Sequence, residues 1–215
     1  MKGKFITVEG PDGAGKTTQL AFIERRLRQR GLEPVMTREP GGTGLGEELR
    51  AVLLNHHGSP ICADAELLMM FAARAQHIDE RILPALAAGQ WVVSDRFTDA
   101  SYAYQGGGRG IPQARLESLE SWVQADFQPD LTLLLDVPVA IGLQRAGGRG
   151  EADDRFEQEA IAFKEAVREA YLQRAQSHPR RIRVVDASGT IEEVQSVLSA
   201  ILDDFCRLQE VISSR

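Results

Sequence analysis

A glycine-rich stretch near the N-terminus constrains the fold more than any other part of the sequence. Residues 8–19 read VEGPDGAGKTTQ and match the pattern G-x-x-x-x-G-K-[ST], with an apolar segment before it and a helix-like segment after it. In this pattern backbone N–H groups converge on a phosphate, and the positive end of the following helix favours the bound anion. We therefore expect a strand, a phosphate-binding loop and a helix, with loop contacts from Gly10, Pro11, Asp12, Gly13, Ala14, Gly15, Lys16, Thr17 and Thr18.

Apolar runs and helix-like patterns alternate along the remainder of the chain. Short apolar segments predict strands at 4–9, 33–37, 90–95, 130–137 and 181–187. Helical spacing of apolar residues predicts helices at 16–30, 63–88, 112–127, 155–177 and 190–211. Apolar strands that alternate with helices are typical of a parallel sheet covered by helices on both faces. We therefore expect an α/β fold whose ligands collect at the carboxyl ends of the strands.

Size and composition limit what the chain can be. Its 215 residues, 43 % of them apolar, are enough for one core, so we expect a single domain over residues 1–215. The formal net charge of −6 argues against a general nucleic-acid binder. No apolar run approaches the length of a membrane span, and two distant cysteines, Cys62 and Cys206, favour a reduced, cytoplasmic compartment. The histidines form no metal-ligand pattern with them, and we interpret all four as surface or cap residues: His56, His57, His77 and His178.

The phosphate-binding loop carries three side chains with expected chemistry. Lys16 would reach the β- and γ-phosphates of a nucleotide, and the Thr17 hydroxyl would bind Mg²⁺. Asp12 is unusual, because a carboxylate inside such a loop repels phosphates. It should face away, toward a sugar hydroxyl or an arginine, or else be an ordinary solvated turn residue. The sequence leaves these alternatives open.

A carboxylate opposite Thr17 would complete a magnesium site. Asp95 and Asp136 both end apolar segments and compete for this role. We favour Asp95, because Arg96 follows it and could hold a second phosphate through two parallel hydrogen bonds. An ordinary surface ion pair is the alternative for Asp95 and Arg96.

The segment after Arg96 suits the recognition of a base and a sugar. Ser101, Tyr104 and Gln105 supply a hydroxyl, an aromatic ring and an amide within a short stretch. Gly106 to Gly108 would then form a flexible connector.

The helix predicted at 63–88 carries Met70, Phe71 and Arg74. The two apolar side chains either pack in the core or form the floor of a pocket that also holds one arginine.

Arginines and glycines are interspersed in residues 143–157, which read LQRAGGRGEADDRFE. One interpretation is an exposed, solvated turn. The other is a mobile lid that closes over transferring phosphates and brings Arg145, Arg149 or Arg155 to the developing charge. The phosphate-binding loop favours the lid, because a kinase must exclude water from the γ-phosphate.

Together these blocks resemble the thymidylate kinases of the bacterial type over essentially the whole chain. The matching blocks stand in the family's order: FITVEGPDGAGKTTQ, TREPGGT, SDRFTDASYAYQGGGRG, PDLTLLLDVP and DRFE. The resemblance implies a P-loop NTPase fold of the nucleoside-monophosphate-kinase type, with a five-stranded parallel sheet, a lid at about 143–157 and a homodimer. It implies transfer of the γ-phosphate of ATP to dTMP, giving dTDP and ADP, with Mg²⁺ as cofactor.

The resemblance also implies roles for individual residues. Residues 10–17 would bind ATP, whose adenine would lie near Arg145 and residues 186–190. Asp95 would serve Mg²⁺ and the reacting phosphates together with Lys16. The dTMP contacts would be Asp12, Glu39, Pro40, Arg50, Phe71, Arg74, Arg96, Ser101, Tyr104 and Gln105. Among them, Arg50 and Arg96 would reach the acceptor phosphate, Arg74 the thymine, and Tyr104 would crowd the 2′ position.

The catalytic arginine and the thymine-stacking residue differ between family members. Eukaryotic members place an arginine inside the phosphate-binding loop, where this chain has Gly13. The bacterial pattern supplies the arginine from the lid, and we choose Arg149 before Arg155 because glycines flank it. The aromatic residue expected four positions before Arg74, where it would stack on the base, is replaced by Met70. Either Met70 gives a softer apolar contact, or a small shift lets the adjacent Phe71 take the role.

Two other functions remain as alternatives. One is a kinase for another nucleoside monophosphate. The other is a nucleotide-dependent switch or partition-type ATPase that acts through a protein partner, although the NKxD guanine signature is absent.

Overall fold

Five parallel strands form the centre of the computed structural model, which describes residues 3–55, 59–146, 155–156 and 158–213. The strands are β1 (Phe5–Glu9), β2 (Val35–Arg38), β3 (Val92–Asp95), β4 (Leu131–Asp136) and β5 (Ile182–Asp186). Their order across the sheet is β2-β3-β1-β4-β5, and every pairing is parallel. The predicted five-stranded parallel sheet is confirmed.

The register of the sheet brings the site residues to one edge. Val8 pairs with Asp95, and Asp95 pairs with Arg38. On the other side of β1, Glu9 pairs with Leu134. Because the strands run in the same direction, the loops that follow them leave the sheet at a common edge, where ligands of such sheets bind.

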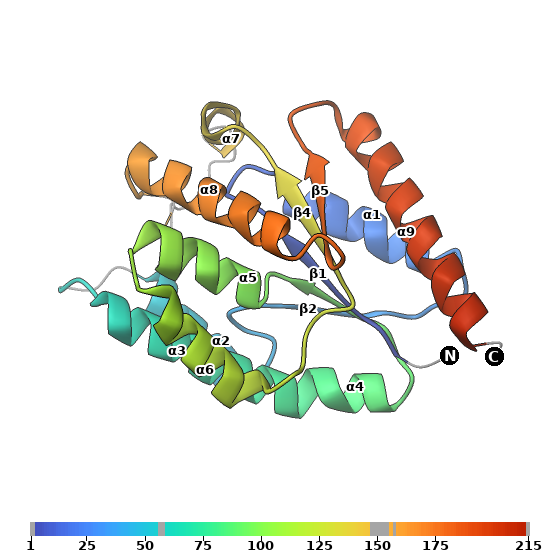
Figure 1. Ribbon diagram of the computed structural model, residues 1–215, viewed down its shortest axis with the longest axis horizontal. Helices are drawn as coiled ribbons and strands as arrows, with labels where there is room; N and C mark the ends of the chain where they lie inside the picture. The colour runs from blue at the N-terminus through green and yellow to red at the C-terminus, as the bar shows by residue number, and fades with distance from the viewer. Residues whose placement is uncertain (1–2, 56–58, 147–154, 157, 214–215) are drawn as a thin grey trace.

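Helices cover both faces of the sheet (Figure 1). Their bounds are α1 (Lys16–Arg28), α2 (Gly44–Leu54), α3 (Ala63–His77), α4 (Leu83–Ala87), α5 (Thr98–Ser101), α6 (Gln113–Gln124), α7 (Val139–Ala146), α8 (Ile161–Ser177) and α9 (Ile191–Ser213). Two π-helical segments, η1 (Ile78–Ile82) and η2 (Tyr102–Gly108), continue α3 and α5. Packing of α1 and α9 against the strands forms the core on one face, through residues such as Ile23, Leu198 and Val93.

The opposite face is covered mainly by α3, η1, η2 and α8. Phe5, Ile82 and Phe97 form one cluster there, and Leu134, Val167 and Tyr171 belong to another. Since apolar side chains fill both faces, the strands read as continuous apolar runs rather than alternating ones.

The glycines after Gln105 are not the flexible connector that the sequence suggested. Gly107 and Gly108 lie in η2, packed against α8. A Cβ on Gly107 would lie 2.6 Å from the Cβ of Ala170, and one on Gly108 would lie 2.4 Å from the Phe163 ring. These glycines therefore permit a close approach of two helical segments.

Other boundaries also differ from the predictions. The helix predicted at 155–177 begins at Ile161. Arg155 lies beside the end of α2 instead, where its backbone N–H donates to Leu54 O (3.3 Å). The helices α2, α5 and α7 were not predicted. None of the helices in the described ranges is long and apolar enough to cross a membrane.

Candidate active site

The phosphate-binding loop has the backbone that its sequence predicts. Gly10, Gly13 and Gly15 adopt φ angles of 143°, 77° and 82°, which glycine tolerates best, and α1 begins directly at Lys16. The Lys16 ammonium donates to Gly10 O (3.0 Å) and Pro11 O (3.1 Å). Burial and the neighbouring Arg96 charge lower the pKa of Lys16 to about 8, against the opposing influence of Asp95 and Asp12.

Gly13 has no room for a side chain. A Cβ at this position would lie 2.1 Å from Gly142 O in α7. Since this contact is with backbone, an arginine at position 13 could not be accommodated without moving α7. The loop of this chain therefore does not accept the arginine that eukaryotic members carry there.

One cavity lies on the α1 side of the loop, between the loop, α7 and the segment after β5. Arg145 in α7 donates to Ala187 O (2.6 Å), Ser188 O (2.9 Å) and Gly189 O (3.1 Å). The structure thus brings Arg145 and residues 186–190 beside the loop, as the resemblance implied. This donor cavity is lined by Gly13, Ala14, Gly15, Thr18, Gln19, Arg145, Ala187, Gly189, Thr190, Ile191 and Val194.

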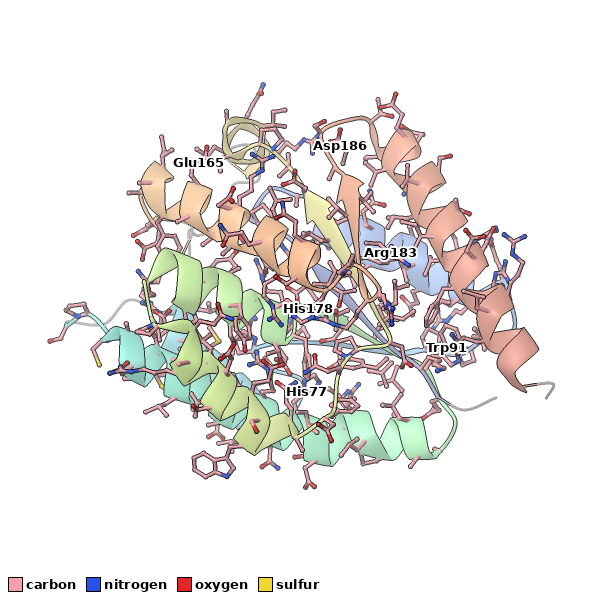
Figure 2. All side chains as sticks on the ribbon, in the orientation of Figure 1. His77, Trp91, Glu165, His178, Arg183 and Asp186 are labelled. Carbon is pink, nitrogen blue, oxygen red and sulfur yellow. The ribbon has the colours of Figure 1, made fainter. Side chains whose placement is uncertain are left out.

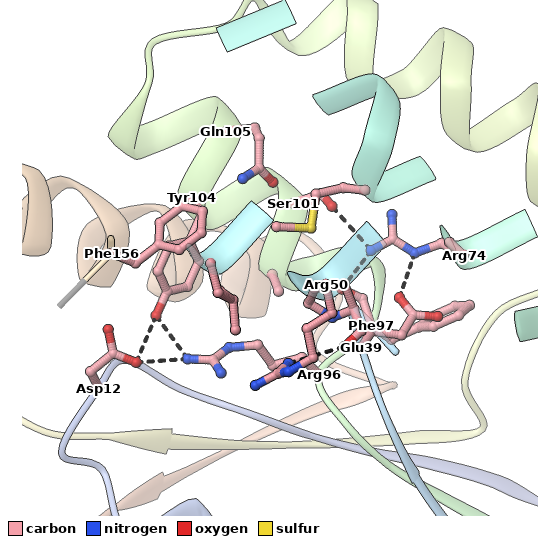
Figure 3. A pocket seen from close by; sticks show the side chains of 14 residues that line it. Asp12, Glu39, Arg50, Arg74, Arg96, Phe97, Ser101, Tyr104, Gln105 and Phe156 are labelled. Carbon is pink, nitrogen blue, oxygen red and sulfur yellow. Dashed lines mark hydrogen bonds and ion pairs between the residues drawn. The ribbon is translucent and has the colours of Figure 1, made fainter. Parts of the chain in front are cut away.

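A second cavity lies on the other side of the loop (Figure 3). Its lining combines three arginines, two carboxylates and several apolar side chains. This acceptor cavity is lined by Asp12, Glu39, Pro40, Arg50, Leu54, Met70, Arg74, Arg96, Phe97, Ala100, Ser101, Tyr104, Gln105 and Phe156. All of the predicted dTMP contacts except Phe71 are therefore gathered around one space.

Phe71 does not line the acceptor cavity. Its side chain is 2 % exposed and packs in a core cluster with Leu67, Tyr102 and Leu116. The Arg74 guanidinium lies over its ring, 4.6 Å from the centroid. Met70 occupies the cavity wall instead, so the placement of Phe71 against a ligand was wrong. Neighbouring helical residues point about 100° apart, and only one of the two can face the cavity.

Asp12 turns toward an arginine, one of the alternatives that the sequence left open. Its Oδ1 accepts from Arg96 Nη2 (2.9 Å) and lies 3.3 Å from the Tyr104 hydroxyl. The same Arg96 nitrogen donates to Tyr104 Oη (2.9 Å). Burial raises the pKa of Asp12, but the charges of Arg96 and Lys16 outweigh it and lower this pKa below its ordinary value.

Arg96 itself sits in a backbone conformation that few non-glycine residues adopt. Its φ is 67°. Hydrogen bonds fix this turn, because Arg96 N donates to Val8 O (3.0 Å) and Phe97 N donates to Glu9 Oε1 (2.7 Å). The Tyr171 hydroxyl donates to the other Glu9 oxygen (2.9 Å). Glu9 thus holds the turn that directs Arg96 into the acceptor cavity.

Sequence reasoning missed Glu9. It is fully buried, and burial together with the nearby Asp99 charge raises its pKa to about 8. The available signal was a carboxylate at the end of an otherwise apolar strand, directly before the loop. Leu54, Phe97 and Ala100, which line the acceptor cavity, were missed as well, and nothing in their residue types distinguishes them from core.

Arg74 is almost completely buried and held from two sides. Its Nε donates to Glu39 Oε2 (2.8 Å), and its Nη2 donates to Phe97 O (3.1 Å) and Ser101 Oγ (3.0 Å) (Figure 3). Its Nη1 is buried and has no hydrogen-bond partner among the described residues. Arg74 also lines the acceptor cavity, so its guanidinium is held in a fixed orientation at that wall.

The structure distinguishes the two carboxylates that competed for the metal. Asp136 accepts two hydrogen bonds from Arg168, at 2.7 and 2.9 Å. Asp95 Oδ1 is buried without a partner among the described residues. Among the described residues, no group of three or more His, Cys, Asp or Glu side chains is arranged to hold a metal ion. Asp95 therefore has the free carboxylate oxygen that suits Mg²⁺, which in such sites takes further oxygen ligands from substrate phosphates and water.

Of the two candidates for the catalytic arginine, Arg149 and Arg155, only Arg155 is among the described residues. Arg149 lies outside the described residues, as does most of the predicted lid at 143–157. Arg155 Nη2 donates to the fully buried Glu66 (2.6 Å), and its Nε donates to Leu53 O (3.1 Å). The Arg155 guanidinium is thus held by hydrogen bonds to α2 and α3.

Two of the four histidines can be compared with their prediction as surface or cap residues. His178 is the C-cap of α8, as expected for a cap residue. His77, at the end of α3 (Figure 2), contradicts the prediction. Its side chain is 0 % exposed. His56 and His57 lie outside the described residues.

A phosphate-binding loop at the edge of a parallel sheet, with a donor cavity on one side and an arginine-rich acceptor cavity on the other, defines a P-loop nucleotide kinase. Residues 8–198 match the sequence profile of the family described as thymidylate kinase. The chain belongs to the thymidylate kinase family.

Individual relatives agree with this assignment. The chain is 58 % identical over 205 residues to a thymidylate kinase of Nitrosomonas europaea, covering 95 % of this chain and 94 % of the relative. It is 54 % identical over 209 residues to that of Pseudomonas syringae pv. syringae, covering 97 % and 99 %. A crystal structure of thymidylate kinase from Ehrlichia chaffeensis superposes with a TM-score of 0.75 at 32 % identity, covering 94 % of this chain and 99 % of that one.

Proposed function

We propose that this chain transfers the γ-phosphate of ATP to dTMP, giving dTDP and ADP, with its 215 residues acting as a single domain. Family membership supports the reaction. The observation that carries the assignment within the structure is the acceptor cavity, which includes Asp12 of the phosphate-binding loop and three arginines in its lining. A switch, a partition ATPase or a kinase for another monophosphate is disfavoured by the same family membership.

Arg96 and Arg50 would bind the phosphate of dTMP. Arg96 projects from its fixed turn toward the loop, and Arg50 of α2 donates to Pro40 O (3.0 Å) at the cavity rim. Guanidinium groups suit a phosphate because they present parallel N–H donors. Together they would place an acceptor oxygen in line with the γ-phosphate.

Arg74, Ser101 and Gln105 would recognise the thymine. The Arg74 guanidinium, which lines the cavity, would face a carbonyl oxygen of the base. Met70 would supply a polarisable apolar contact in place of an aromatic ring. Glu39 and Pro40 would lie beside the sugar, and Tyr104 would crowd its 2′ position.

The phosphate-binding loop, Gly10 to Thr18, would hold ATP, with Arg145 at the adenine. Thr17 and Asp95 would hold Mg²⁺, which when bound neutralises charge on the β- and γ-phosphates. Lys16 would contact these phosphates directly. No covalent enzyme intermediate is required, since alignment and charge neutralisation suffice for direct transfer.

Arg149 remains our candidate for the arginine that meets the transferring phosphoryl group. An arginine in this role contributes about 10³-fold or more to turnover. Arg149→Ala should therefore reduce kcat strongly while leaving the affinity for dTMP nearly unchanged, and Arg155→Ala serves as the comparison from the same segment. Wild-type turnover in Arg149→Ala would remove this role.

We further propose a homodimer in the cytoplasm. Three helices, α2, α3 and α6, lie on one side of the molecule (Figure 1). Each exposes an apolar side chain: Leu45 (47 %), Leu68 (56 %) and Trp122 (82 %). Helix α3 contacts both of the others. A second copy would cover these residues, and light scattering that finds a monomer at working concentration would exclude the dimer.

The deciding experiment is ADP release from Mg-ATP against dTMP, dUMP, dCMP, dGMP, AMP and no acceptor. Strong release with dTMP, accompanied by dTDP, is the expected outcome. Equal release without an acceptor would mean that the phosphate goes to water, and the proposal would fall.

A further inference from the structure

His77 is a fully buried polar residue that the proposed reaction does not use. It ends α3, three residues after Arg74, and it does not line the acceptor cavity. Its Nδ1 lies 2.8 Å from Glu39 Oε1, and its Nε2 lies 2.7 Å from Thr37 Oγ1. Both ring nitrogens are therefore engaged, and any effect of His77 on a ligand must pass through a neighbour.

Glu39 is that neighbour, because its two carboxylate oxygens have different partners. Oε1 faces His77 Nδ1, and Oε2 accepts from Arg74 Nε at 2.8 Å. An ionised carboxylate can only accept, so Nδ1 of His77 is the donor in this pair. The Thr37 hydroxyl, which can donate or accept, fixes the other end of the ring.

The backbone around this chain of contacts leaves it little freedom. Gly42, in the loop after β2, passes so closely that a Cβ there would lie 2.6 Å from Thr37 Oγ1 and 2.7 Å from His77 Nε2. Buried polar chains whose members are all hydrogen-bonded favour one conformation over its alternatives. The imidazole therefore holds the Glu39 carboxylate in a single orientation.

The orientation of the Glu39 carboxylate determines how the Arg74 guanidinium is held. With Nε on Glu39 and Nη2 on Phe97 O and Ser101 Oγ, the planar guanidinium cannot rotate. This fixed guanidinium belongs to the lining of the acceptor cavity. If Glu39 turned, Nε would lose its acceptor and the guanidinium could move.

We propose that His77 is a positioning residue for base recognition: with Thr37 it fixes Glu39, which fixes the Arg74 guanidinium so that its positive charge faces a carbonyl oxygen of the acceptor base. This inference rests on the proposed dTMP kinase activity. A rigid donor rewards a base that carries an oxygen at that position and penalises one that carries an amino group, because two donors would then face each other. His77 therefore contributes to discrimination of thymine and uracil from cytosine, and not to discrimination between thymine and uracil.

The test compares His77→Leu with His77→Asn by steady-state kinetics on dTMP, dUMP and dCMP. In His77→Asn the amide nitrogen can replace Nδ1 as the donor to Glu39, whereas His77→Leu has no donor. We expect His77→Leu to raise KM for dTMP and to lower the dTMP/dCMP ratio of kcat/KM, each by about tenfold, as when one hydrogen bond to a charged group is lost. KM for ATP and the dTMP/dUMP ratio should stay unchanged, and His77→Asn should recover most of the loss.

Two further variants keep the test decisive if His77→Leu does not fold. Thr37→Val removes only the far end of the chain and should shift the dTMP/dCMP ratio in the same direction by a smaller factor. Leu202→Ala, on the core-facing side of α9, is the matched control, because it destabilises the fold without touching Arg74 and should leave the ratio unchanged.

Several results would overturn the inference. They are a wild-type dTMP/dCMP ratio in both His77→Leu and Thr37→Val, an equal loss on every acceptor, or a similar shift in Leu202→Ala. Failure of the wild-type protein to phosphorylate dTMP would instead refute the proposed function, so the two failures are distinguishable.

Discussion

Gly42 offers the sharpest test of the packing around Glu39 and His77. Its φ of 80° lies in the left-handed region, where an L-residue costs about 1–2 kcal/mol. A Cβ would also lie 2.6 Å from Thr37 Oγ1, 2.7 Å from His77 Nε2 and 2.9 Å from His77 Cδ2. Because His77 is fully buried and cannot move aside, overpacking adds about 1–3 kcal/mol. We expect Gly42→Ala to lower the free energy of unfolding by about 2–5 kcal/mol.

Two other glycines separate these contributions. Gly31 has a φ of 75° but nothing within 4 Å of its Cβ position, so Gly31→Ala should cost only the backbone strain of about 1–2 kcal/mol. Gly44, at the start of α2, has neither a left-handed φ nor a close neighbour. Gly44→Ala should therefore be neutral or slightly stabilising, because alanine favours the helix.

The assay is urea unfolding at a fixed protein concentration, followed by tryptophan fluorescence and checked by thermal unfolding. For a protein of this size about 1 kcal/mol corresponds to about 2–4 °C in Tm. Gly42→Ala should also raise KM for dTMP, since the clash falls on His77, whereas Gly31→Ala should not. A Gly42→Ala protein as stable as Gly31→Ala would refute the packing that we describe.

Three further predictions concern ionisable groups. Since Lys16 loses its proton as pH rises through about 8, ATP affinity should fall about tenfold per pH unit above that value, whereas Lys16→Arg should give a flat profile in calorimetry. The folded protein holds a proton on Glu9 up to about pH 8, which the unfolded chain releases near its ordinary pKa of 4.5, so this contribution to stability declines as pH rises between those values. The Tm of wild type minus that of Glu9→Gln should therefore fall from pH 5 to pH 8, and a constant difference would contradict the assignment. Asp95→Asn should raise the Mg²⁺ concentration for half-maximal activity, whereas Asp136→Asn should lose only its Arg168 ion pair, about 0–1 kcal/mol of stability; the opposite pattern in a Mg²⁺ titration would reverse the choice.

The sequence predicts the sheet and the edge at which the site lies, because both follow from local patterns. Buried parallel strands are visible as apolar runs, and the phosphate-binding loop specifies its own backbone through Gly10, Gly13 and Gly15. The sequence patterns did not predict the helical segments α2 and η2, which contain several glycines. In α2 and η2 the glycines permit close contacts that only the folded chain reveals; a Cβ added to Gly107, for example, would lie 2.7 Å from Ala166 O.

The interior of the site was harder to predict than its position. Met70 and Phe71 are adjacent and both apolar, so nothing local determines which one faces the cavity. Glu9 and His77 act through partners distant in the sequence, Tyr171 and Glu39. Such roles depend on tertiary contacts that a single sequence does not encode in its periodicity.

The strand order β2-β3-β1-β4-β5 separates the binding determinants of the two substrates. Except for Phe156, the acceptor cavity takes its lining from the loop after β1 and from segments that follow β2 and β3. The donor cavity is lined from the loop after β1 and from segments that follow β4 and β5. Substitutions on one half of the sheet can therefore accumulate with little effect on the substrate bound by the other half. A protein engineer who wished to change the base accepted by this scaffold could redesign α3 and η2 and leave the ATP half untouched.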